Sequence, residues 1–362
     1  MNKSKVKAAV IGCGNISKAH IRAIQANNHK VELYAVCDII EEKAIATAQE
    51  YGAVKYYTDY RKMLEDENID FVSICTPSGM HADMAADCAK AGKHVLCEKP
   101  IDIIHEKLDK IVESFENNNL KFGGVFQYRT YPGLLKAKQM LDNGELGKVY
   151  IGDGYCKIYR SAEYYKSAGW RGTWALDGGG CLMNQGIHTL DVLCWLMGGV
   201  VSAEAKTFTL ARDIEVEDTA FAFLKFKNGG YGTFLGTTLA YPGTGVKVEI
   251  LCEKGKIVFT DPKTYLYKTD EKGNEIEICL DLIEVDKTAE ASETKSSEKT
   301  NTANDPAALT STGHAFLVSN LADAIVEDKE TFVSAKEGRH AVDVILAIYE
   351  SSKTGKEITI KG

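Results

Sequence analysis

The chain has 362 residues, which is long for one domain and sufficient for two domains that each bury a core. Hydrophobic residues make up 44%, as in soluble globular proteins, and 43 basic against 51 acidic side chains give a net charge of -8. This charge argues against nucleic acid or an anionic membrane as the main partner. No stretch approaches the roughly 20 apolar residues of a membrane helix. Ten cysteines without a C-x-x-C pair favour free thiols in a reducing cytoplasm.

The first predicted strand, residues 6–12, is a continuous apolar run, typical of a strand covered on both faces of a parallel sheet. A glycine turn, a helical segment and a second apolar strand follow. Gly12 permits a tight turn, Gly14 lets the main chain approach a pyrophosphate, and the helix N-terminus supplies amide donors. Ser17 occupies the third glycine position, so the motif is G-x-G-x-x-S, and an isolated motif of this kind can also be a simple turn.

Asp38, at the end of the second strand, strengthens the prediction of a nucleotide site. A carboxylate there accepts hydrogen bonds from both adenosine ribose hydroxyls and repels a 2′-phosphate, which favours NAD over NADP. The predicted cofactor-binding residues are Gly12, Gly14, Asn15, Ile16, Asp38, Thr76, Pro77, His81, Glu98 and Lys99. No metal site is predicted.

Strands and helices continue to alternate down to residue 127. Strands are expected over 69–77, 93–100 and 120–127, and helices over 80–92 and 104–118. This alternation predicts a doubly wound parallel sheet whose ligand lies beyond the carboxyl ends of the strands. The sequence C-E-K-P lies at such an end, so Lys99 is expected to face the cofactor, although charges followed by proline also mark ordinary surface turns.

A second domain is expected beyond the NAD-binding domain, so the predicted boundaries are 1–126 and 127–362. An amphipathic helix over 132–147 precedes alternating runs separated by turn signals such as Asn228-Gly229, which predict a large, open, mostly antiparallel sheet. Such an open face usually binds a partner. Self-association across it, into a homodimer or homotetramer, is therefore expected.

One helix of the second domain, expected over 183–198, carries polar residues on an apolar background. By helical spacing, Asn184, His188, Asp191 and Trp195 share one face. A histidine that donates to Asp191 one turn later would be an ordinary buried pair. Three polar groups on such a helix are nevertheless costly to bury unless they meet something polar, such as a polyhydroxylated substrate.

The last quarter of the chain begins with a polar segment over 284–304, rich in Ser, Thr, Lys and Glu. Its composition predicts a mobile excursion, either an inert surface loop or a lid. Helical patterns resume over 313–328 and 335–352, and their apolar faces should pack on the sheet or on the nucleotide domain.

The chain resembles the glucose-fructose oxidoreductase, inositol dehydrogenase and MocA family. The similarity is carried by AVIGCGNIS, CTPSGMH, CEKP, GGGCLMNQGIHTLD and GRHAVDVILAIY, which span nearly the whole chain in the expected order. It implies a Rossmann domain followed by an α/β domain with a large open sheet that commonly forms dimers or tetramers. It also implies a sugar or cyclitol substrate bound over the nicotinamide.

The resemblance also implies roles for single residues. Lys99 matches the catalytic lysine, Glu98 would lie near the nicotinamide ribose, and Pro100 would follow a cis bond. His188 matches the histidine that binds the reacting hydroxyl. Asn184 stands where the family has Asp, and because an amide cannot relay a proton, Lys99 would carry more of that burden or the proton would leave through water. The same substitution is similar to members acting on nucleotide-linked sugar acids or on C3 of glycosides.

The expected catalytic pair is therefore Lys99 and His188. The expected substrate site contains Asn184, Asp191, Arg171, Trp170, Gln127 and His314, of which Arg171 and His314 would meet a substrate carboxylate, phosphate or ring oxygen.

These observations favour an NAD-dependent dehydrogenase that oxidises a secondary hydroxyl of a pyranoside, sugar acid or cyclitol. Lys99 would be the general base, and His188, held by Asp191, would orient the hydroxyl. The lysine pKa, ordinarily near ~10.4, would have to be lowered by burial and by the nicotinamidium charge. Two alternatives stay open: a glycosidase that keeps NAD bound and uses transient C3 oxidation, without net NADH, and a non-catalytic sensor of NAD or sugar.

Overall fold

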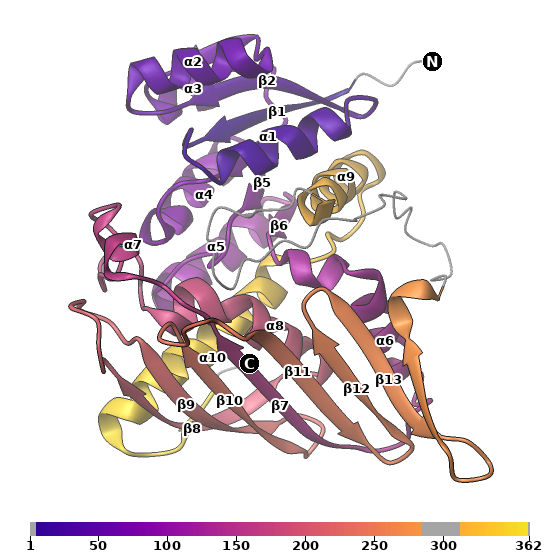
Figure 1. Ribbon diagram of the computed structural model, residues 1–362. Coiled ribbons are helices and arrows are strands. Elements are labelled where there is room, and N and C mark those ends of the chain that lie inside the picture. The colour runs from indigo at the N-terminus through magenta and orange to yellow at the C-terminus, as the bar shows by residue number, and fades with distance from the viewer. Residues whose placement is uncertain (1–4, 284–311, 361–362) are drawn as a thin grey trace. The chain divides into compact units, whose positions relative to one another are not determined.

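The computed structural model describes residues 5–283 and 312–360 (Figure 1). The chain divides into two compact units, with a boundary between Phe126 and Gln127. Of the described residues, the first unit contains 5–126 and 312–339, and the second contains 127–283 and 340–360. The polar segment predicted over 284–304 lies outside the described residues.

The first unit is built on a six-stranded parallel sheet of order β3-β2-β1-β4-β5-β6. Its strands are β1 (Val6–Ile11), β2 (Val31–Cys37), β3 (Lys55–Tyr57), β4 (Phe71–Ile74), β5 (His94–Cys97) and β6 (Phe122–Gly124). The strand order reverses between β1 and β4, which is the switch point at which doubly wound sheets bind ligands. The predicted Rossmann fold is confirmed.

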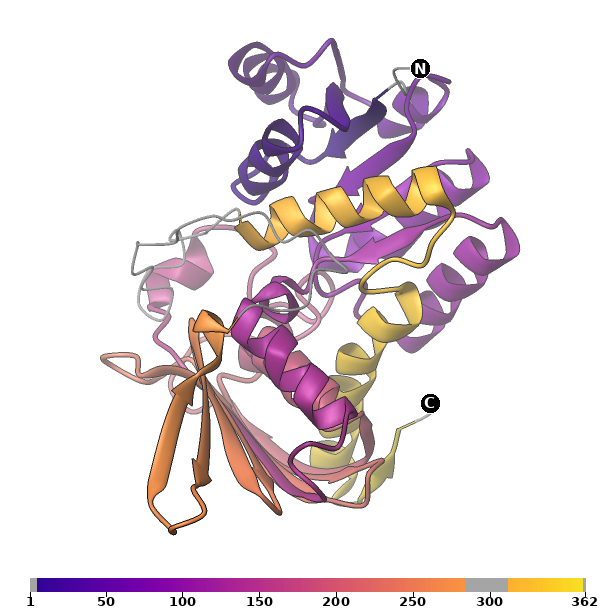
Figure 2. The ribbon, with the colours of Figure 1, turned by 90° about the vertical axis from the view of Figure 1, so that its right-hand side faces the viewer.

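Helices cover this sheet and include one from the end of the chain. They are α1 (Ser17–Ala26), α2 (Glu41–Tyr51), α3 (Tyr60–Leu64), α4 (His81–Lys90), α5 (His105–Asn117) and α9 (Thr312–Glu327). Figure 2 shows α9 as a long yellow helix beside this sheet. Leu317, Val318 and Leu321 of α9 share a core with β1 and α1, and Lys30 forms an ion pair of 2.9 Å with Asp323. Residues 312–339 therefore belong with the nucleotide unit, whereas the sequence placed them in the second domain.

The second unit contains a nine-stranded sheet of order β14-β13-β12-β11-β7-β10-β9-β8-β15. Its strands are β7 (Val149–Lys157), β8 (Val200–Phe208), β9 (Thr219–Phe226), β10 (Tyr231–Thr237), β11 (Gly245–Cys252), β12 (Gly255–Thr260), β13 (Lys263–Thr269), β14 (Glu275–Cys279) and β15 (Ile358–Thr359). Neighbouring strands are antiparallel except β7 and β10. The prediction of a large, mostly antiparallel sheet is confirmed.

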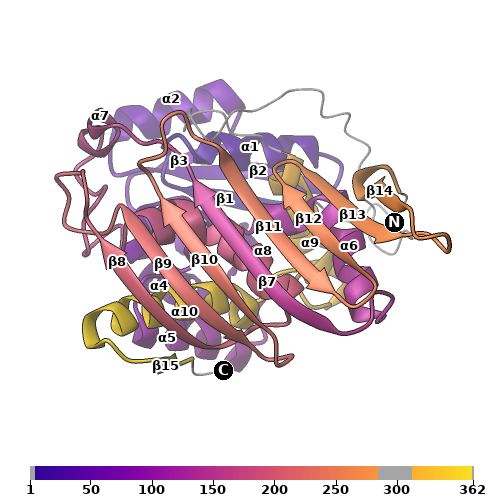
Figure 3. The ribbon, with the colours of Figure 1, turned by 60° about the horizontal axis from the view of Figure 1, so that its bottom comes forward.

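Helices line one face of this sheet, and Figure 3 looks onto the other face. The helical segments of the unit are η2 (Gln127–Thr130), α6 (Pro132–Asp142), α7 (Ala162–Lys166), η3 (Cys181–Gly186), α8 (Ile187–Leu196), η4 (Leu280–Leu282) and the part of α10 (Ala335–Thr354) from His340 onward. Gly152 of β7 allows Met197, the residue after α8, to pack closely on the sheet. A Cβ at position 152 would lie only 2.6 Å from the Met197 sulfur. On the open face, Phe221, Phe223 and Tyr231 are exposed.

The helix predicted over 183–198 is in fact two segments. Cys181–Gly186 forms a turn of π-helix, and α8 begins only at Ile187. Hydrogen bonds in a π-helix join residues five apart rather than four, so α-helical spacing does not describe which side chains share a face here. This spacing therefore does not apply to Asn184, whereas His188, Asp191 and Trp195 all lie on the regular helix α8.

Candidate active site

The glycine turn after β1 fits a dinucleotide pyrophosphate. Gly12 has φ +90°, and a Cβ there would lie 2.8 Å from the carbonyl oxygen of Cys75, so only glycine is compatible with this turn. A Cβ at Gly14 would meet no atom within 4 Å, which leaves open space above the N-terminus of α1. The Ser17 hydroxyl donates to the Gly14 carbonyl over 2.6 Å and is buried, so serine serves in the third glycine position.

Asp38 lies directly after β2, where the ribose carboxylate is expected. Its Oδ2 accepts from the main-chain N–H of Cys13 over 2.8 Å, and its Oδ1 accepts from the N–H of Ile40 over 2.9 Å. The two amides fix the carboxylate against the glycine turn. Each oxygen retains a lone pair for a ribose hydroxyl, so the residues present fit NAD.

The C-E-K-P sequence forms a turn at the carboxyl end of β5. Lys99 is half-buried, and the peptide bond between Lys99 and Pro100 is cis, as the resemblance implied. His81 is 1% exposed, and its two ring nitrogens lie 2.7 Å from the Pro100 carbonyl oxygen and 2.8 Å from that of Thr76. His81 thus ties the lysine turn to the turn after β4, rather than offering its ring to a ligand.

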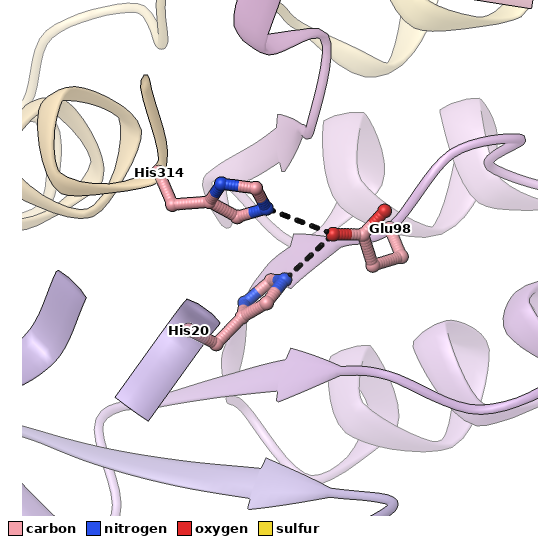
Figure 4. Close-up of side chains that lie close together, drawn as sticks. All are labelled: His20, Glu98 and His314. Atoms are coloured by element: carbon pink, nitrogen blue, oxygen red, sulfur yellow. Dashed lines mark hydrogen bonds and ion pairs between the residues drawn. The ribbon is translucent and has the colours of Figure 1, made fainter. Parts of the chain in front are cut away.

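Glu98 lies at the centre of a buried cluster with two histidines (Figure 4). Its Oε1 is 2.8 Å from Nε2 of His20, on α1, and 3.2 Å from Nε2 of His314, on α9. Burial alone would raise the pKa of Glu98, but the hydrogen bonds from the two histidines outweigh it and hold this pKa well below its usual value. Burial lowers the pKa of His20, which favours a neutral imidazole beside an ionised carboxylate.

A second polar cluster lies in the second unit, around the π-turn. The Asn184 amide donates to Oδ1 of the buried Asp177 over 2.7 Å, and the Gln185 amide donates to Asn184 over 2.9 Å. Glu217 anchors the start of the turn, because its carboxylate accepts from the N–H groups of Gly180 and Leu182, each over 2.9 Å. Position 184 itself holds an amide, but the carboxylate of Asp177 lies directly beside it.

Two arginines extend this cluster over one tyrosine ring. The guanidinium carbon of Arg171 lies 4.1 Å from the ring centroid of Tyr164, and that of Arg160 lies 5.4 Å from it. Arg171 also lies 5.0 Å from the Trp170 ring, and Arg160 donates to the Gln185 side chain over 2.9 Å. The predicted residues Arg171, Trp170 and Asn184 are thus brought together. The site is cationic and aromatic, which suits an anionic ligand.

Asp191 requires a correction. The sequence expected it to hold His188 or to bind substrate, but it is 1% exposed and both of its oxygens accept from the Arg129 guanidinium, over 2.7 and 2.9 Å. This ion pair offsets the free-energy cost of burying the Asp191 carboxylate on α8. The Trp195 ring lies 5.5 Å from the Arg129 guanidinium carbon. His188 is half-buried, and its ring lies 5.2 Å from the ring of Tyr128.

His314 and Gln127 occupy different surroundings. His314, expected to bind substrate, is buried in the first unit against Glu98. Gln127 is half-buried at the start of η2, and its main-chain carbonyl accepts from the Thr130 hydroxyl. His20, Arg129, Arg160 and Asp177 were missed, and of these only His20 carried a signal, as a polar residue on the buried face of the helix after the glycine turn.

Models of known protein families match both parts of the chain. A model described as oxidoreductase family, NAD-binding Rossmann fold, matches residues 6–124, and a model of the GFO/IDH/MocA C-terminal domain matches residues 134–258. No helix among residues 5–283 and 312–360 is long and apolar enough to cross a membrane.

Several dehydrogenases are similar over most of their length. An inositol 2-dehydrogenase of Saccharopolyspora erythraea is 30% identical over 70% of this chain and 73% of its own, and a D-glucoside 3-dehydrogenase of Escherichia coli is 28% identical over 64% and 69%. Among solved structures, a WlbA dehydrogenase from Bordetella pertussis, in complex with NADH and UDP-GlcNAcA, is 31% identical with a TM-score of 0.81, covering 99% of this chain and 100% of that one.

Proposed function

Because this chain belongs to the glucose-fructose oxidoreductase, inositol dehydrogenase and MocA family of NAD-binding oxidoreductases, we propose that it oxidises a secondary hydroxyl of a sugar acid or related pyranoside. The observation that carries this proposal is the turn bearing Lys99. It stands at the carboxyl end of β5 and is joined through His81 to the turn after β4, where a doubly wound sheet binds its cofactor.

The proposed chemistry divides between the cofactor and the chain. Gly12, Gly14 and Asp38 would hold NAD, which would supply the acceptor for the hydride of the carbinol carbon. Lys99 removes the hydroxyl proton as general base, so the alcohol becomes a ketone and the proton passes from the amine to water. His188 orients the hydroxyl and stabilises the developing negative charge on its oxygen; such positioned groups contribute about 10²–10⁴-fold each.

The cluster around Tyr164 supports an anionic substrate. Two guanidinium groups lie within 5.4 Å of one ring centroid, and two like charges held together are stabilised when an anion is bound between or beside them. The WlbA structure that is similar over the whole chain contains a nucleotide-linked sugar acid. A carboxylate or diphosphate on the substrate would meet Arg171 and Arg160.

The proposal is tested by absorbance at 340 nm with NAD and matched pairs of compounds, such as a glucuronide and the corresponding glucoside, nucleotide-linked and free. We expect NADH formation with the acid, and a loss of about 10²–10⁴-fold in kcat for Lys99→Met. Full activity in Lys99→Met would refute the role of the lysine. Release of the aglycone or nucleotide without net NADH would instead indicate the glycosidase alternative.

Specificity for the acid has its own test. Arg171→Leu should raise KM for the sugar acid by about 10-fold or more, since a hydrogen bond to a charged group is worth roughly 1.5–3 kcal/mol, and should leave KM for the neutral glycoside nearly unchanged. Lys263→Leu, which removes an exposed charge from β13 of the same unit, is the matched control. An equal rise in KM for both substrates would refute an anionic subsite.

We also propose that the open face of the nine-stranded sheet binds a second copy of the chain. Phe208, Phe221, Phe223 and Tyr231 are 43–51% exposed on adjacent strands, and the Phe223 and Tyr231 rings stack at 5.7 Å. Phe223→Lys should yield monomers in light scattering after size-exclusion chromatography. Val54→Lys, at an exposed position of the first unit, should not change the mass. A native protein that is already monomeric at micromolar concentration would refute this proposal.

A further inference from the structure

Three of the eight histidines of the chain converge on the turn that carries Lys99. His20 and His314 bind the Glu98 side chain, and His81 lies 2.7 Å from the Pro100 carbonyl oxygen. Each of these imidazoles is at most 1% exposed. Polar rings are costly to bury, so three of them around one turn of three residues call for an explanation other than core packing.

The Glu98 carboxylate transmits these contacts to the lysine. Its Oε1 receives the two imidazoles, and its Oε2 accepts from the main-chain N–H of Lys99 over 3.1 Å. A carboxylate with one oxygen held by α1 and α9 cannot rotate freely about its side chain, so its second oxygen presents a fixed acceptor to the next peptide. The orientation of the Lys99 backbone is thereby set from two helices that are far apart in the sequence.

The hydrogen-bond chemistry fixes one tautomer. An ionised carboxylate only accepts, so each Nε2 must carry its proton. Nδ1 of His20 then accepts from the buried Ser73 hydroxyl, 3.1 Å away, while Nδ1 of His314 has no hydrogen-bond partner among the described residues. His20 is thus held at both nitrogens and His314 at one, which makes His314 the more sensitive position for a test.

We propose that His20 and His314 are positioning residues, which hold the Glu98 carboxylate and through it aim Lys99 at the reacting hydroxyl. The inference rests on the proposed function of Lys99. A displacement of a catalytic group by about 1 Å can cost roughly 10²-fold in rate, so a small rotation of Glu98 is sufficient to matter. Neither histidine touches substrate in this scheme, and both act on the turnover number rather than on substrate affinity.

The matched variants are His314→Gln and His314→Asn, two amides that differ in reach. The glutamine nitrogen can take the place of Nε2 and still donate to Glu98, whereas the asparagine nitrogen is too short to do so. We expect His314→Asn to lower kcat by about 10- to 100-fold with KM and NADH affinity changed less than about twofold, and His314→Gln to retain most of kcat. His94→Leu, which removes a partly buried histidine at the opposite end of β5, should change kcat less than about twofold.

Coupling to the lysine is measured by a double-mutant cycle with single-turnover rates. In a Lys99→Met background, His314→Asn should change the residual rate less than about twofold, because the group that it aims is gone. Equal kcat in the two amide variants, or a full multiplicative loss in the double variant, would overturn the inference. If Lys99→Met itself is fully active, the proposed function fails instead. His20→Gln and His20→Leu repeat the comparison if His314→Asn does not fold.

A metal ion is the competing account of this cluster. His20, Glu98 and His314 are the one group of three metal-ligating side chains in the described part of the chain whose ligand atoms all lie within 4.8 Å of one another. Direct contacts of 2.8 and 3.2 Å to one carboxylate oxygen are ordinary hydrogen bonds and need no ion. Stoichiometric zinc in the purified protein, whose removal by a chelator lowers kcat, would overturn the positioning role.

Discussion

Two buried carboxylates, Asp191 of the second unit and Glu98 of the first, are compensated in different ways. In the second unit Asp191 is paired with the permanent charge of Arg129 through two hydrogen bonds. In the first unit Glu98 accepts instead from two imidazoles, those of His20 and His314, and burial lowers the pKa of His20. In the first arrangement burial raises the pKa of Asp191 and the Arg129 guanidinium opposes the rise, and this pair serves the fold. The second keeps a carboxylate ionised beside the proposed base without placing a second permanent cation next to Lys99.

The largest expected effect breaks the pair in the second unit. Arg129→Leu leaves Asp191 buried without a partner and should lower the free energy of unfolding by about 3–5 kcal/mol. Urea unfolding followed by tryptophan fluorescence measures this directly, because the three tryptophans, Trp170, Trp174 and Trp195, all lie in the second unit.

The control for that prediction replaces both partners. Arg129→Met combined with Asp191→Leu removes both charges at similar volume and should be much less destabilising than Arg129→Leu alone, since an apolar pair of matched size often equals or exceeds a buried ion pair. A double variant as unstable as the single one would show that packing of Arg129, rather than its charge, is what matters.

The next effect concerns pH and the first unit. Because burial lowers the pKa of His20, the unfolded chain binds a proton near its ordinary pKa of 6.5 that the folded chain refuses, so stability falls as the pH drops through this value. The loss of stability develops as the unfolded chain takes up this proton between about pH 7.5 and 5.5. His20→Gln should remove this part of the decrease in the free energy of unfolding. Urea unfolding at several pH values, followed by circular dichroism, measures it.

Glutamine at position 20 keeps a donor for the Glu98 carboxylate, which limits the change at Glu98 when wild type is compared with His20→Gln. Glu98 has a lowered pKa, so its contribution is complete above its ordinary value of 4.5 and is lost only at lower pH. His94 and His340 also have lowered pKa values, that of His340 to about 4, and contribute equally to both proteins. The exposed His29→Gln serves as control, and an identical fall in the His20 and His29 variants would contradict the prediction.

The smallest expected effect measures how much the Trp195 ring contributes to holding Arg129 beside Asp191. The Trp195 ring lies 5.5 Å from the Arg129 guanidinium carbon and 5.9 Å from the Lys138 ammonium. Trp195→Phe keeps an aromatic face with a weaker attraction for cations and should cost about 0.5–1 kcal/mol. Guanidinium chloride unfolding by circular dichroism measures it, and a cost like that of Arg129→Leu would mean that the ring, not Asp191, holds the arginine.

The cofactor half could be predicted because its signals are local. Gly12 and Asp38 are separated by one helix and one strand, and the pattern of glycine, helix and acid reports the same contacts that the structure contains. Lys99 was placed at a strand end by the same alternation. The family resemblance added the cis bond before Pro100, which no residue pattern indicated.

The buried polar partners could not be predicted, because they are distant in sequence. Arg129 and Asp191 are 62 residues apart, and Glu98 and His314 are 216 apart. Without knowledge of those contacts, Asp191 was assigned to the histidine one helical turn away, which is the partner that spacing alone suggests. Asp177 was missed for another reason: the π-turn changes which side Asn184 faces.

That π-turn has a consequence for how the site can evolve. A π-turn joins residues five apart rather than four, so it sets the register between the residues before it and α8. Scanning Cys181–Gly186 with point variants would test the side chains but never the register. Deletion of one residue within this segment would rotate Asn184 away from Asp177 while α8 stays in place, which no single substitution can do.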